Sequence, residues 1–145
     1  MFQADLERGL LLGRRALADL VAFTPTYGVA MWMVSTAEVV VGDPAAALAV
    51  CAEARRLLAA EGGPEDWRTS QLYNMTSYVA GVVGDRDTER TEAHCAVAVA
   101  RRLAIPTLLA VVLTFQGHAL CDNDPKLRSS PLMRPLVCTR PERVT

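Results

Sequence analysis

The feature that most constrains this chain is a pattern that occurs three times along its 145 residues. Each copy has an Arg-Arg pair near the end of an alanine-rich stretch, then a short break, an apolar stretch and a turn. The pairs are Arg14-Arg15, Arg55-Arg56 and Arg101-Arg102, and the turns are Gly42-Asp43-Pro44, Gly84-Asp85-Arg86 and Asn123-Asp124-Pro125. Separations of 41 and 46 residues between the pairs, and of 42 and 39 between the turns, match a two-helix repeat. Because one helix hairpin cannot bury all of its apolar surface, such units stack, and the pattern predicts an α-solenoid.

Proline, glycine and aspartate divide the chain into predicted helices at about 3–21, 25–41, 44–60, 64–83, 87–104 and 106–121. Pro25 suits a first helical turn, Asp43 can cap the amides of the next helix, and Gly42 can end a helix. The chain is 51% hydrophobic but only 6% aromatic, which favours close-packed helices over sheets. We therefore predict an all-α fold of antiparallel helix hairpins, with a repeat domain at 1–124 and a Pro/Arg-containing tail without packed structure at 125–145.

Charge and cysteine usage exclude several classes of function. Residues 126–145 carry +4, so residues 1–125 carry −5, and an acidic body offers no electrostatic reason to bind nucleic acid. The four cysteines have no metal-ligand spacing and are expected to be small buried residues of a reducing cytoplasm. The acidic N-terminus is unlike a secretion signal. Glu38 in one apolar stretch, and Gln116 and His118 in another, argue against membrane spans.

No motif for nucleotide hydrolysis, dinucleotide binding, zinc proteolysis or serine hydrolysis occurs in the chain. His94 and Cys95 are adjacent, so on a helix they point about 100° apart and are poor partners as base and nucleophile. His118 is expected to lie near a helix C-terminus. We predict a protein that is not an enzyme, with no catalytic, cofactor-binding or metal-binding residue.

Two polar features lie within otherwise apolar helices. Glu38 needs a partner if it is buried, such as an arginine on the neighbouring helix; otherwise it lies at an exposed edge or faces a binding partner. The second feature is the face of the fourth helix that carries Trp67, Gln71, Asn74, Tyr78 and Gly81 at spacings of four, three, four and three. Its opposite side, with Leu72, Met75, Val79 and Val82, is expected to be core. An ordinary half-exposed helix has the same pattern, but Trp67, Gln71, Asn74 and Tyr78 are the residues we predict to contact a partner.

The segments 42–58 and 84–103 each open with Gly-Asp and run through alanines to Ala-Arg-Arg-Leu. They resemble tetratricopeptide (TPR)-like repeats and are similar to the helical arrays that follow the ATPase module in large LuxR-type and related actinobacterial transcription regulators. The resemblance covers about residues 3–124. It implies a bacterial protein in which the helical array senses or relays a signal, while DNA is bound elsewhere.

The function expected from these features is a protein-interaction or regulatory module of the cytoplasm, without a cofactor. The stretch from Pro106 to Cys121 is followed by no polar helix that could cover its outer face, so self-association or docking of a protein partner is expected at this C-terminal flank. The alternative is a small-molecule sensor with an apolar pocket near Met31, Trp32, Tyr73 and Tyr78.

Overall fold

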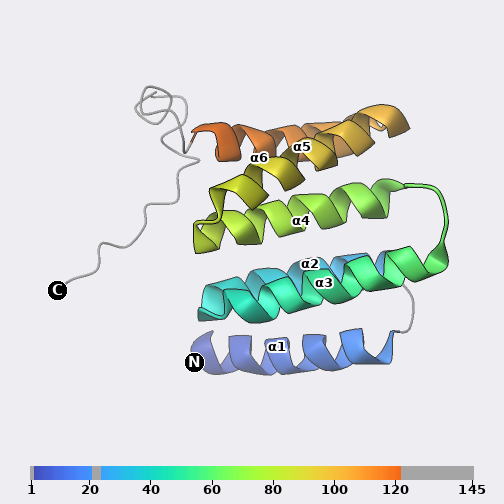
Figure 1. Cartoon of the computed structure of the whole chain (residues 1–145). Coiled ribbons are helices and arrows are strands. Elements are labelled where there is room, and N and C mark those ends of the chain that lie inside the picture. Colours follow the sequence, from blue (N-terminus) through green and yellow to red (C-terminus); the bar gives the residue numbers. More distant parts are fainter. Residues whose placement is uncertain (1, 21–23, 122–145) are drawn as a thin grey trace.

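The computed structural model describes residues 2–20 and 24–121, and this part of the chain contains six α-helices and no strand (Figure 1). The helices are α1 (Phe2–Asp19), α2 (Pro25–Val41), α3 (Pro44–Glu61), α4 (Trp67–Val83), α5 (Arg86–Leu103) and α6 (Pro106–Cys121). The predicted all-α class is confirmed. The predicted tail at 125–145 lies outside the described residues.

The helices form a two-layered stack. Each helix packs on its neighbours in sequence, and α2 and α6 also both contact α4. The backbones of the odd-numbered helices α1, α3 and α5 do not pack on one another in the described chain, although an ion pair joins Arg55 of α3 to Glu92 of α5. Figure 1 shows α4 between the pairs α2/α3 and α5/α6, with α1 at one edge of the stack. The even-numbered helices therefore make up one continuous layer, as expected for a helical repeat bundle.

Local capping explains where the helices begin and end. Gly42 and Gly84 adopt the left-handed conformation, with φ of 90° and 84°, and donate their N–H groups to the carbonyls of the last helical turn. The aspartate that follows each glycine then caps the next helix, with Asp43 accepting from the Ala46 amide at 2.9 Å and Asp85 from the Thr88 amide at 3.1 Å. The repeated Gly-Asp dipeptide thus makes two tight turns, from α2 to α3 and from α4 to α5.

The start of α4 differs from the prediction. The helix begins at Trp67 rather than near residue 64, because Asp66 is its N-cap and has extended backbone. The Asp66 carboxylate accepts from the Arg68 amide at 2.8 Å. Glu65 and Asp66 therefore precede the helix instead of occupying its first turn.

Two apolar clusters form the core. One joins α2, α3 and α4 around the fully buried Met31, Met75 and Val79, and the other joins α5 to α6 around Ala100 and Val112. The predicted stripe on the fifth helix is confirmed, with Ala93, Ala96, Val97 and Ala100 buried and Leu103 packed against their cluster. The prediction for α4 is wrong at Val82, which is 44% exposed because it lies in the last helical turn beside the exposed Val83 and Gly84.

Among the described residues, no helix has the length and apolar character needed to cross a membrane.

Candidate interaction surface

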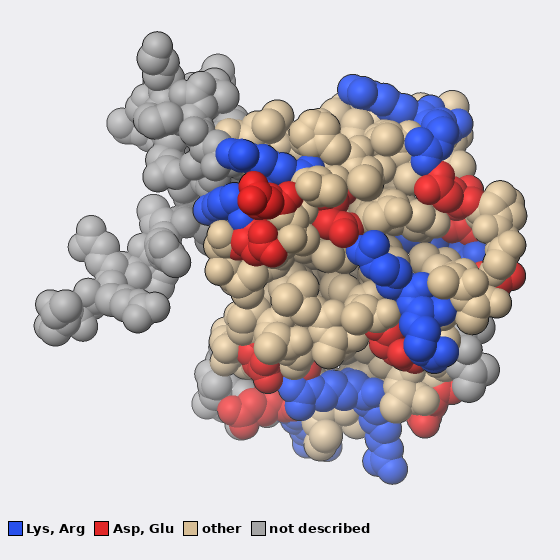
Figure 2. Space-filling view, in the orientation of Figure 1, with Lys and Arg blue, Asp and Glu red and all other residues tan. Residues whose placement is uncertain are grey.

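Charged side chains are divided very unequally between the two layers. Helices α1, α3 and α5 carry six, four and seven charged residues, whereas α2 and α4 carry one each, Glu38 and Arg68, and α6 carries no acidic residue, lysine or arginine. Figure 2 shows red and blue side chains distributed over the face on which α3 and α5 lie in front in Figure 1. The layer of α2, α4 and α6 is therefore nearly uncharged, although the charge content of the whole chain is ordinary.

The single acidic residue of α2 is turned inward and neutralised. Glu38 is 1% exposed, and both of its oxygens accept hydrogen bonds from Arg14 of α1, from Nε at 2.5 Å and from Nη2 at 2.7 Å. The hydrogen bond to Glu38 is the main reason why the pKa of Arg14 is raised. Of the readings left open for Glu38, the buried ion pair with an arginine of the neighbouring helix is confirmed. The carboxylate is not available to an outside partner.

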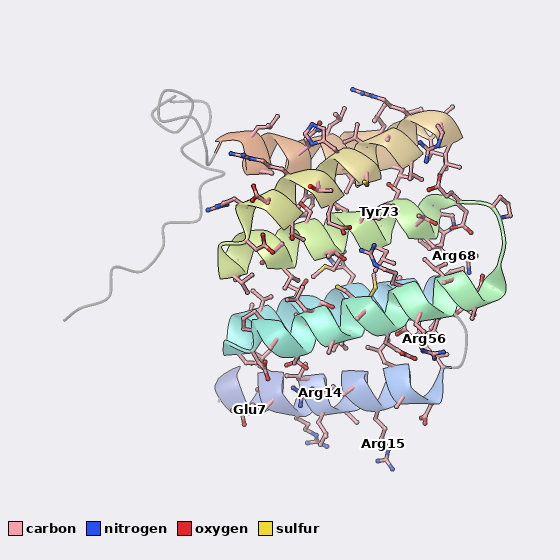
Figure 3. The ribbon with its side chains drawn as sticks, in the orientation of Figure 1. Glu7, Arg14, Arg15, Arg56, Arg68 and Tyr73 are labelled. Atoms are coloured by element: carbon pink, nitrogen blue, oxygen red, sulfur yellow. The ribbon has the colours of Figure 1, made fainter. Side chains whose placement is uncertain are left out.

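The single charge of α4 points to the other layer. Arg68 pairs with Glu61 at 2.8 Å and with Asp66 at 2.7 Å, and it lines a hollow of about 240 Å³ with Arg55 and Tyr73. Figure 3 shows Arg68 near the loop from α3 to α4 and Tyr73 further along α4, whereas Arg56 lies on the side of α3 that faces α1. Burial acts to raise the pKa of Asp66, but the hydrogen bonds from Arg68 outweigh it and the pKa is lowered.

The repeated arginine pairs take part in contacts within the chain. Arg14 binds Glu38 of α2, Arg55 binds Glu92 of α5 at 3.0 Å, and Arg102 binds Glu65 before α4. The Arg55 guanidinium also lies 5.3 Å from the ring centroid of Tyr73. The charged layer is thus held by ion pairs between neighbouring helices. One arginine of each repeated pair therefore joins two parts of the stack.

The exposed face of α2 carries a ridge of apolar side chains. Val29, Met33 and Val40 are 61%, 66% and 61% exposed, and their spacing places them along one side of the helix. Met33 is the central residue of α2. We call these three side chains the α2 ridge.

An apolar groove lies on each side of the α2 ridge. The first, between α1 and α2, has a volume of about 610 Å³ and is lined by Leu6, Gly9, Leu10, Gly13, Ala30 and Ala37 among others. The second, of about 270 Å³, runs between α2, α4 and α6 and is lined by Trp32, Trp67, Gln71 and Val111. Trp32 and Met33 border both. Among the described residues, Asp5 is the one charged side chain that lines either groove.

The four residues predicted to contact a partner do not share one exposed face. Trp67 and Gln71 do line the second groove. Tyr78 is half-buried and packs edge-to-face on Phe115 of α6, with ring centroids 6.1 Å apart. Asn74 is fully buried, which corrects its assignment to an open surface. The physical reason is that α2, α5 and α6 all pack on α4, with Phe115 of α6 against Tyr78, so the face is largely covered by the chain itself.

Of the four residues of the predicted ligand pocket, Met31, Trp32 and Tyr78 belong to one apolar cluster, in which Trp32 and Tyr78 both pack on Phe115, and Tyr73 lies apart from them. Met31 is fully buried in the core between α2, α3 and α4. Trp32 lines the grooves beside the α2 ridge, whereas Tyr73 lines the hollow of the charged layer. Tyr73 is separated from the other three because α4 places Tyr73 and Tyr78 on different sides.

The histidines and cysteines form no constellation in the part of the chain that can be described. No group of three or more His, Cys, Asp or Glu side chains there could hold a metal ion. His94 is exposed and its Nδ1 donates to the Arg90 carbonyl at 2.8 Å. Cys51 is buried, as predicted, and burial raises the pKa of its thiol; Cys95 is half-buried. The side chains of His118, Cys121 and Cys138 lie outside the described residues.

No protein-family model, curated protein or solved structure matches this chain. The residues that make the surface must therefore be found from the chain itself. The α2 ridge was not predicted from the sequence, although the sequence contains a signal for it. Charge is nearly absent from alternate helices, and α2 has more valines and methionines than one buried side of a helix can hold.

Proposed function

We propose that this chain is a protein-interaction module, without catalytic activity, whose binding surface is the uncharged face of α2, α4 and α6. The observation that carries the proposal is the α2 ridge with its two grooves. Interface centres are depleted in charge and enriched in methionine and aromatic residues, and Met33, Trp32 and Trp67 provide these here. Large exposed apolar patches on an otherwise charged protein commonly mark binding sites.

The C-terminal flank forms part of this surface. On α6, Val111, Leu113 and Leu120 are exposed, and Val111 lines the second groove. The side chains of the α2 ridge are more exposed than those of α6, so we place the centre of the surface on α2 and its border on α6. A partner that presents an apolar segment with few charges fits this surface best.

The experiment is binding of the dye 8-anilinonaphthalene-1-sulfonate, at a protein concentration of about 1 μM or lower where sedimentation shows a monomer. We expect dye fluorescence to rise with the native chain and to fall strongly with Met33→Lys. The matched control is Leu11→Lys, because Leu11 is 65% exposed against 66% for Met33 but lines neither groove. Equal dye binding by the native chain and Met33→Lys, or no dye binding by either, would contradict the proposal.

We further propose that the module belongs to the helical repeat region of a bacterial transcription regulator. This proposal rests on the resemblance of the segments 42–58 and 84–103 and on the two Gly-Asp turns that they form. Reading the coding sequence on both sides tests it, since an ATPase or DNA-binding domain encoded in the same frame would support it. A different class of domain in that frame would contradict it.

A second candidate function is the binding of a small apolar molecule between α1 and α2. The groove there has a volume within the range of about 300–1,000 Å³ that is typical of ligand pockets. A thermal-shift screen distinguishes the two candidates, because a ligand that stabilises a monomer supports the pocket. Association without any ligand supports the interaction module.

A further inference from the structure

We propose that the partner that docks on the α2 ridge is a second copy of this chain, with the two α2 helices packed antiparallel about a two-fold axis beside Met33. This inference rests on the proposed function and names the occupant of its surface. The arrangement is isologous, so each copy uses the same residues. Three properties of the exposed face around the α2 ridge support this inference: its shape, its charges and its size.

The shape of the face is self-complementary. Helices pack by inserting the ridge of one into the groove of another, and this face has both: the α2 ridge and, beside it, the groove of about 610 Å³. Met33 is the middle residue of α2, so an axis beside it brings residues at equal distances from Met33 together. Val29, on the ridge, then meets Ala37 of the partner subunit, a small residue that lines the groove. A protruding side chain thus meets a small one on both sides of the axis.

The charges permit this approach. The acidic residue of α2, Glu38, is buried and paired with Arg14, so two α2 helices bring no like charges together. Asp5 lies in the groove beside Val40, near the C-terminal end of α2. Antiparallel packing brings the N-terminal end of the partner's α2 to that point. A carboxylate is favoured there, because the helix N-terminus carries partial positive charge.

The size of the face is sufficient. A helix of 17 residues is about 25 Å long, and three neighbouring helices at about 9 Å spacing span about 27 Å. With the axis beside Met33, α2 and its two neighbours α1 and α4 meet the partner subunit, and their outer face measures on the order of 700 Å², close to the roughly 800 Å² per partner that is typical of stable complexes. The area alone does not set the dissociation constant, because affinity depends on how well the central side chains pack.

The test is analytical ultracentrifugation of the full chain up to about 100 μM, together with variants at the axis. The native chain should sediment as a dimer. Met33→Lys and Met33→Glu should each weaken association by on the order of 100-fold, because like charges then face each other across the axis. Leu11→Lys should associate as the native chain does. Circular dichroism confirms that each variant is folded, and Val29→Lys replaces any variant that is not.

Mixing the two charge variants provides the decisive test of the proposed dimer. Met33→Lys and Met33→Glu chains should form a mixed dimer that neither forms alone, since opposite charges then meet at the axis. A partner of another kind, or a folding defect, would not produce this rescue. A native chain that is monomeric at about 100 μM, or mixed variants that stay monomeric, would overturn the proposed dimer.

The dye experiment separates failure of this inference from failure of the proposed function. Dye binding that depends on Met33, together with a monomer at every concentration, would exclude the second copy and leave the interaction surface intact. A monomer without dye binding would exclude both.

Discussion

Replacing Arg14 with methionine is expected to lower the free energy of unfolding by about 3 kcal/mol, because the change leaves the Glu38 carboxylate buried without a partner. Glu38 is 1% exposed and receives two charge-assisted hydrogen bonds from Arg14, at 2.5 and 2.7 Å. Removing one partner of a buried pair typically costs about 3–5 kcal/mol. We expect the lower end of this range, because Arg14 itself is 50% exposed and water can reach its side of the pair.

The same geometry predicts that the two partners are not equivalent. Glu38→Leu releases Arg14 into water, with which its guanidinium can hydrogen-bond, and places an apolar side chain in a buried position. Its effect should therefore stay within about 1 kcal/mol, and so should that of the double variant. Arg14→Met alone should be the least stable of the three. A loss of about 3 kcal/mol is large against the total of about 5–15 kcal/mol that is usual for a domain.

The assay is urea unfolding followed by far-ultraviolet circular dichroism, with the four chains forming a double-mutant cycle. Arg15→Met is the matched control, because it removes the adjacent arginine and leaves the pair in place. The reasoning is refuted if Arg14→Met is no more destabilising than Arg15→Met. It is also refuted if the effects of Arg14→Met and Glu38→Leu simply add.

Three further predictions concern the packing and the caps. Gly13→Ala should lower the unfolding free energy by about 1–2 kcal/mol, because the new alanine Cβ would lie 2.6 Å from Cγ2 of the buried Val34. Gly9→Ala should raise the unfolding free energy by about 0.5–1 kcal/mol, because the space around Gly9 is open and alanine favours the helix. Urea unfolding compares the two, and equal effects would contradict the close helix approach. Asn74→Leu should stabilise the fold by about 1–2 kcal/mol, since neither polar atom of this buried amide has a hydrogen-bond partner in the described chain. A lower urea midpoint for this variant would show that the amide of Asn74 is hydrogen-bonded in the folded protein. Because the pKa of Asp66 is lowered in the folded protein, the unfolded chain binds more protons near pH 4. The stability that the Asp66 carboxylate contributes is therefore present above the ordinary aspartate pKa and is lost as the pH falls through the pKa of the folded protein. Asp66→Asn keeps a capping side chain and should flatten the loss of stability below about pH 4 in unfolding curves; unchanged pH dependence would exclude this role.

The positions of the helices could be predicted because their signals are local. Pro25, the Asp43 cap and the left-handed Gly42 each act within one turn of the backbone, and the observed bounds of α2 follow from them. The start of α4 differs from the predicted residue 64 because Glu65 and Asp66 both lie before the helix. Only Asp66 accepts from the helix amides, and an N-cap residue stands outside the helix that it caps.

Which faces are covered could not be predicted from helical spacing alone. Asn74 and Gln71 share one side of α4, yet Asn74 is fully buried and Gln71 lines a groove, because the helices packed on α4 cover one turn and leave the other partly open. Tyr73 and Tyr78 differ from this case, because residues five apart are about 140° apart around a helix and helical spacing alone places them on different sides. A helix with four neighbours has no simple polar and apolar halves, and α4 contacts α2, α3, α5 and α6.

The sequence by itself determined the helices, their turns and their stacking, because capping and repeat length depend on residues close together in the chain. The sequence also indicated that Glu38 needs a partner if it is buried, since a buried carboxylate in an apolar helix must be neutralised. Only the tertiary structure decided that Arg14 supplies this partner, and that the even-numbered helices share one layer. That layer turns its two charged residues inward or toward the other face, and the exposed α2 ridge results from this arrangement of helices.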